Sequence, residues 1–141
     1  MEGSGSSVVG DGERIGEMRA GQVFVFGSNE QGIHGAGAAK QARQSFGAEI
    51  GVGEGPTGRC YALPTRYVSG RTFISLTLPQ IAVNVERFLV YASAHPESEF
   101  LMTKVGCGLA GHSESSMAAL FATAPANVVL PNGWTRKNDS A

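Results

Sequence analysis

Short apolar runs alternate along this chain with segments whose apolar residues share one helical face. Residues 23–26 (VFVF) are β-branched and aromatic, which is typical of a buried strand. The clearest helix pattern follows residues 77–80 (TLPQ), a capping-box sequence with a proline in the first turn. Its apolar face consists of Ile81, Val85, Phe88, Leu89 and Ala92. We expect this helix to end before Pro96.

The same alternation continues in the rest of the chain. We expect one helix at 36–46, stopped by Gly47, and another at 114–123, capped by Ser113 or a neighbour. The predicted strands are 59–63, ended by Pro64, then 72–74, 99–105 and 127–130. Residues 48–58 contain four glycines and are predicted to form a loop.

Strands that alternate with helices predict an α/β fold, a three-layer α/β/α sandwich around a mixed, mostly parallel sheet. A length of 141 residues with 42% hydrophobic residues fits a single domain with one substantial core. We assign that module to residues 22–134. Residues 1–21 are interpreted as a flexible leader, native or added for expression, and residues 135–141 as a mobile tail.

Charge and cysteine content narrow the classes of partner. The net charge of -1 argues against nonspecific electrostatic binding to DNA or to an anionic membrane. No apolar run is long enough to span a bilayer and no signal peptide begins the chain, so we expect a cytoplasmic protein without a membrane partner. The two cysteines are expected to remain thiols. The sequence does not indicate an oligomeric state.

Glycine is the outlier of the composition, with 20 residues against an ordinary share of roughly 7%. Much of the excess lies in two loops, each placed after a predicted strand and before a predicted helix. Such loops bind phosphate, because free backbone N–H groups point at the anion and absent side chains let it approach. The predicted ligand-binding residues are Gly27, Ser28, Asn29, Gly35, Ala36, Gly37, Ala38, Gly106, Cys107, Gly108, Leu109, Ala110 and Gly111. Tight turns and close packing are the alternative explanation for these glycines.

Three residues beside these loops are candidates for catalysis. Asn29 could position a ribose or a water, or simply bond its own turn. His34 and His112 could act as general bases, or could be ordinary loop histidines. Neither loop contains Gly-Lys-Ser/Thr, which argues against an ordinary nucleoside triphosphatase. No CxxC or HxxxH spacing indicates a metal, and we expect no cofactor.

Taken together, these segments resemble the macro domain family of ADP-ribose-binding modules. The resemblance is carried by Ser28–Asn29 with the run 35–38 (GAGA), by 105–109 (VGCGL) and by 59–66 (RCYALPTR). It is closest in motif to the branch that removes ADP-ribose from glutamate or from DNA. Ala110 stands where that branch has an acidic residue, and Arg66 lies near the position of its lysine. The Asp with which the family recognises adenine has no counterpart here.

The resemblance implies binding of ADP-ribose or a related nucleotide diphosphate sugar between the two loops, with Asn29 at the distal ribose. Two uses of such a site remain open. The protein could hydrolyse an ADP-ribosyl bond or a phosphoester, or it could be a non-catalytic reader or sponge of a nucleotide signal. An ADP-ribosylated macromolecule is a further candidate partner. A domain with packing glycines and no small ligand is the third alternative.

Overall fold

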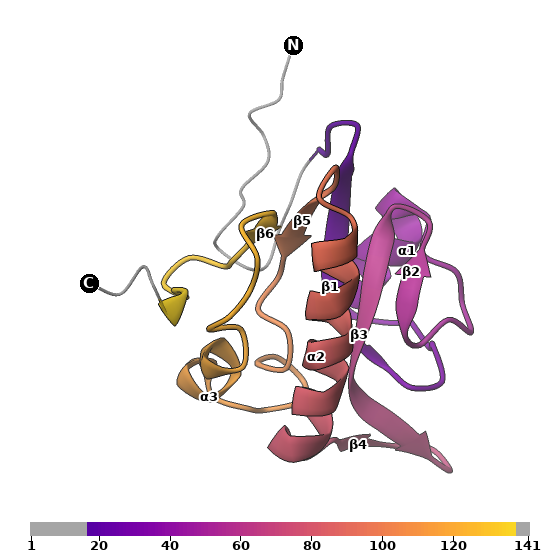
Figure 1. Cartoon of the computed structure of the whole chain (residues 1–141). Helices are drawn as coiled ribbons and strands as arrows, with labels where there is room; N and C mark the ends of the chain where they lie inside the picture. Colours follow the sequence, from indigo (N-terminus) through magenta and orange to yellow (C-terminus); the bar gives the residue numbers. More distant parts are fainter. Residues whose placement is uncertain (1–16, 138–141) are drawn as a thin grey trace.

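The computed structural model describes residues 17–137, which fold around a six-stranded sheet (Figure 1). The sheet order is β2-β3-β1-β5-β6, with β4 paired to β3. The elements are β1 (Gln22–Asn29), α1 (Gly37–Phe46), β2 (Gly55–Thr57), β3 (Cys60–Ser69), β4 (Thr72–Ser75), α2 (Leu78–Ala94), β5 (Glu99–Met102), α3 (Glu114–Ala119) and β6 (Val128–Val129). The central pairs β3–β1, β1–β5 and β5–β6 are parallel, and β2 and β4 pair with β3 in the antiparallel sense. The predicted mixed, mostly parallel α/β fold is confirmed.

The sheet is buried on both faces, as β1 shows. Its side chains alternate between two cores: Phe24 and Phe26 pack with α1, whereas Val25 packs with α2 and α3. Figure 1 shows α2 lying across one face of the sheet and α1 behind the other. This is the arrangement of a three-layer sandwich.

The helix ends follow from local sequence chemistry. At the start of α2, the Thr77 hydroxyl accepts from the Gln80 amide while the Gln80 side chain accepts from the Thr77 amide, which completes the predicted capping box. Gly47 ends α1 with a left-handed φ of 81°, as a C-terminal glycine does. Ser113 caps α3, but that helix ends at Ala119 and is shorter than predicted.

Strand β3 differs most from the prediction, because it continues through Pro64 to Ser69. A proline lacks the N–H that a central strand needs. Here Pro64 lies between the segment paired with β2 and the segment paired with β4, beside a register shift in β1. Its carbonyl accepts a hydrogen bond from Asn84 on α2. The extended β3 and β4 therefore form a hairpin that the sequence did not predict in full.

The described parts of the two end segments contact the module. The Arg59 guanidinium donates to the carbonyls of Met18 and Arg19, and the Glu99 amide donates to that of Gly21. Near the other end, Arg136 donates to the Ala124 carbonyl. The remainder of the predicted leader and tail, residues 1–16 and 138–141, lies outside the described residues. Within residues 17–137 no helix combines the length and apolar character needed to cross a bilayer.

Candidate functional site

A pocket of about 610 Å³ opens at the carboxyl ends of β1 and β5, beside residues 65–66 in the middle of β3. Both glycine-rich loops contribute to it, and they meet at Gly27, where a Cβ would lie 3.6 Å from the Gly106 amide nitrogen. The residues lining the pocket are Gly27, Asn29, Ile33, Gly35, Ala36, Gly37, Ala38, Ala39, Thr65, Arg66, Phe73, Thr103, Lys104, Val105, Gly106, Gly108, Leu109 and Ala110. Ligands of parallel α/β sheets bind at this edge.

The first loop runs from β1 to the amino end of α1. Asn29 is buried and holds the loop: its Nδ2 donates to the Ile33 carbonyl at 2.7 Å and its Oδ1 accepts from the Ile33 amide at 2.9 Å. The loop then leads to the ten-residue helix α1, whose N-cap, Ala36, makes no side-chain cap hydrogen bond. No acidic residue stands in the first turn. The positive end of α1 therefore faces the pocket without a side-chain cap at Ala36.

The second loop follows β5. Gly106 packs closely on α3, since a Cβ there would lie 2.7 Å from the Met117 sulfur, and its φ is 78°. Gly108 differs, because an added Cβ would meet nothing within 4 Å. The same holds for Gly35 in the first loop. Neither Gly35 nor Gly108 has a left-handed φ, so protein packing and backbone conformation do not explain these two glycines.

Two cations line the pocket and no acidic side chain of the described residues does. Arg66 lies half-buried with its guanidinium 4.6 Å from the centre of the Phe73 ring, and within residues 17–137 it has no carboxylate partner. Burial removes part of the water around this charge and lowers the Arg66 pKa from its ordinary value. Lys104 Nζ donates to Glu114 Oε2 at 3.2 Å. The pocket therefore has the electrostatic character of an anion site.

The remaining polar side chains of the lining already have partners. Thr103 donates to the Val25 carbonyl at 2.8 Å, and Thr65 donates to the Ser28 carbonyl at 3.4 Å. Both are buried. Because the Asn29 side chain bonds to Ile33, the charged side chains available to a ligand are Arg66 and Lys104, and the Lys104 ammonium also donates to Glu114.

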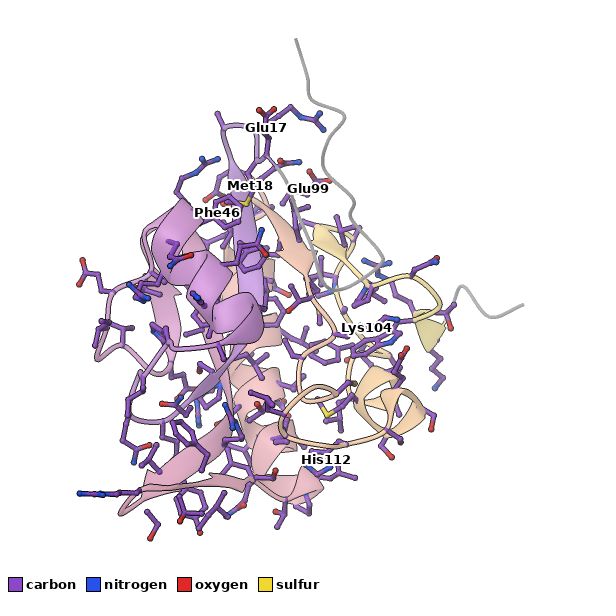
Figure 2. All side chains as sticks on the ribbon, turned by 180° about the vertical axis from the view of Figure 1, so that it is seen from behind. Glu17, Met18, Phe46, Glu99, Lys104 and His112 are labelled. Carbon is purple, nitrogen blue, oxygen red and sulfur yellow. The ribbon has the colours of Figure 1, made fainter. Side chains whose placement is uncertain are left out.

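The two candidate histidines lie outside the lining. His34 is buried against Phe26, and its Nε2 donates to the Glu49 carbonyl at 3.2 Å, while Nδ1 has no partner among the described residues. Burial lowers the His34 pKa below its ordinary value. His112 donates through Nε2 to the Leu76 carbonyl at 2.8 Å. Figure 2 labels His112 and Lys104, which lie at the two ends of the second loop.

Three other predicted ligand residues also lie outside the lining. Ser28 is buried and donates to the Gly53 carbonyl. Cys107 packs against the core on the α2 side, and Gly111 turns the chain with a φ of 82°. The structure thus brings together ten predicted residues: Gly27, Asn29, Gly35, Ala36, Gly37, Ala38, Gly106, Gly108, Leu109 and Ala110.

The lining residues that the sequence analysis missed come from the first loop, the first turn of α1, the β3–β4 hairpin and the segment after β5. They are Ile33, Ala39, Thr65, Arg66, Phe73, Thr103, Lys104 and Val105. Lys104 and Val105 could have been inferred, because they precede the second loop directly. Phe73 gave no signal, because its approach to the pocket depends on the length of the β3–β4 hairpin.

Comparison with known proteins shows the fold and leaves the function open. No protein-family model matches the chain, and no curated protein does. A solved structure of a protein of unknown function from Bacteroides thetaiotaomicron is similar, with a TM-score of 0.59 and 13% sequence identity. The match covers 83% of this chain and 90% of that one. At this identity the likeness concerns the arrangement of the backbone alone.

Proposed function

We propose that this protein is a module that binds ADP-ribose or a related nucleotide diphosphate sugar in the pocket between its two glycine-rich loops. The observation that carries the proposal is the electrostatic make-up of the pocket. Within residues 17–137 Arg66 has no carboxylate partner, Lys104 is paired with Glu114 outside the lining, and Ala36 provides no side-chain cap at the amino end of α1. The described lining residues include no acidic side chain. Such a set favours a strongly anionic ligand.

A diphosphate matches this set better than a single phosphate. Two separate segments, the first loop with the start of α1 and the second loop, each bring backbone amides to the lining. A pocket of about 610 Å³ is also within the range of small-molecule sites, roughly 300–1,000 Å³. We infer that each loop binds one phosphate and that Arg66 and Lys104 neutralise their charge.

Of the two uses of the site, binding without turnover has the better support. Hydrolysis usually requires a carboxylate or an imidazole within reach of the reacting atoms. His34 and His112 bond to backbone carbonyls outside the lining, and the described lining contains no carboxylate. We therefore propose that the protein is a reader of a nucleotide signal rather than a hydrolase.

Titration calorimetry of the full chain with ADP-ribose tests binding. Gly35→Ala and Gly108→Ala should each weaken it, because the added methyl meets no protein atom within 4 Å and intrudes on the ligand. Gly70→Ala is the matched control: Gly70 lies in the β3–β4 turn, outside the pocket, with a φ of 64°. That variant should lose stability and keep binding.

Absence of heat at millimolar ADP-ribose, with the protein shown to be folded, would contradict the proposal. The reader interpretation also predicts that an ADP-ribosylated protein is recovered unmodified after incubation with the chain. Release of free ADP-ribose at a rate that depends on enzyme concentration would establish the hydrolase alternative instead.

A further inference from the structure

Three large apolar side chains are exposed around the opening of the pocket. Ile33 is 44% exposed, Phe73 41% and Leu109 69%, and each comes from a different segment of the chain. Single exposed apolar residues are ordinary, but a group of them at one site indicates a ligand surface. We call these three residues the apolar rim.

Two of the three rim residues, Ile33 and Phe73, are held in place by hydrogen bonds and strand pairing. Ile33 is fixed through both its amide and its carbonyl by the Asn29 side chain. Phe73 pairs with Val68 within the hairpin, and the first loop contacts the same strand, where the Val68 amide donates to Gln31 Oε1 at 2.8 Å. A rim fixed in this way is prepared for a rigid, flat group.

One rim residue already stacks with a planar cation. The Arg66 guanidinium lies 4.6 Å from the centre of the Phe73 ring, and part of the ring stays open to solvent. Arginine planes and aromatic rings are the surfaces on which nucleobases stack in proteins that bind single strands. A nucleoside diphosphate whose phosphates occupy the glycine loops would bring its base to this rim.

Among the described lining residues, no uncharged polar side chain is free to distinguish one base from another. Asn29, Thr65 and Thr103 are bonded to the backbone, and the described lining contains no carboxylate that could accept from an exocyclic amine. Under the proposed function the N–H groups of the two cations donate to the phosphates, which leaves the flat face of the Arg66 guanidinium for stacking. Stacking tolerates every base, because each has a π face.

We propose that the apolar rim binds the base of a nucleoside diphosphate by stacking, chiefly on Phe73 and Arg66, and accepts adenine, guanine and uracil alike. This inference rests on the proposed function, since it needs the phosphates in the glycine loops. Under this inference the protein recognises the diphosphate and a flat ring, and it does not distinguish one base from another.

Calorimetric titration with ADP, GDP, UDP and inorganic pyrophosphate tests it on the full chain. We expect the three nucleotides to bind within about tenfold of one another and all more tightly than pyrophosphate. Phe73→Ala should weaken each nucleotide by about tenfold and leave pyrophosphate within about twofold of the wild-type value. Leu109→Ala, at a more exposed position, repeats the test with less risk to the fold. Val90→Ala, at an exposed position on α2 outside the pocket, is the control and should change neither.

The results separate the two proposals. A preference of more than tenfold for one base overturns the inference, as does an unchanged nucleotide affinity in both rim variants. If pyrophosphate binds and no nucleotide binds more tightly, the rim inference fails while the phosphate site stands. If none of the four ligands binds, the proposed function fails and the inference fails with it.

Discussion

Arg66→Gln is the substitution that separates the phosphate site from ordinary packing most clearly. A hydrogen bond to a charged group contributes about 1.5–3 kcal/mol, so loss of the guanidinium should weaken ADP-ribose binding roughly 10- to 150-fold. The effect on the fold should be small. The contact with Phe73 contributes about 0.5–1 kcal/mol at a partly exposed site, and removal of a partly desolvated cation offsets some of that loss.

Calorimetry measures the affinity in this test, and urea unfolding measures the stability. Arg71→Gln is the matched control: it removes the same charge from the turn of the same hairpin, and Arg71 is exposed and does not line the pocket. The control should bind like the wild type. If Arg66→Gln and the control bound ADP-ribose equally well, Arg66 would not contact a phosphate and the reasoning from the pocket charges would be refuted.

Three further substitutions test other parts of the structure, each by urea unfolding. Burial lowers the His34 pKa, so as the pH falls through 6.5 the unfolded chain protonates its imidazole before the folded protein does. The free energy of unfolding should therefore fall between pH 7 and pH 5, and His34→Gln should reduce that fall. An unchanged slope would contradict this prediction. Asn29→Ala removes two hydrogen bonds to Ile33 and should destabilise the protein by about 1–3 kcal/mol. A loss below about 0.5 kcal/mol would mean that these hydrogen bonds do not stabilise the first loop. Thr77→Ala removes the capping hydroxyl of α2 and should destabilise by about 1 kcal/mol, with ADP-ribose affinity unchanged because α2 does not line the pocket.

Local chemistry made part of this fold predictable. The capping box at Thr77 and the glycine at position 47 place helix ends whatever surrounds them, because the groups involved are neighbours in sequence. The meeting of the two glycine loops followed from topology, since parallel strands leave their carboxyl ends at one edge of the sheet. Neither step required knowledge of tertiary packing.

The parts that were missed depend on contacts between distant segments. A proline such as Pro64 is typical of a strand end. Strand β3 continues past it because Pro64 is paired with neither β2 nor β4, and the continued strand carries Arg66 to the pocket. His34 precedes Gly35 in sequence, yet it packs toward Phe26 while Gly35 lines the pocket. Proximity in sequence to a ligand loop therefore did not determine which side chains face the ligand.

The central claim is that the two glycine-rich loops bind one ligand together. Backbone amide chemical shifts, followed by two-dimensional NMR during a titration with ADP-ribose, test it directly. The account predicts that the amides of Gly35, Gly37, Gly106 and Gly108 shift together and saturate with a single dissociation constant. Shifts confined to one loop, or an unchanged spectrum at millimolar ligand, would contradict it.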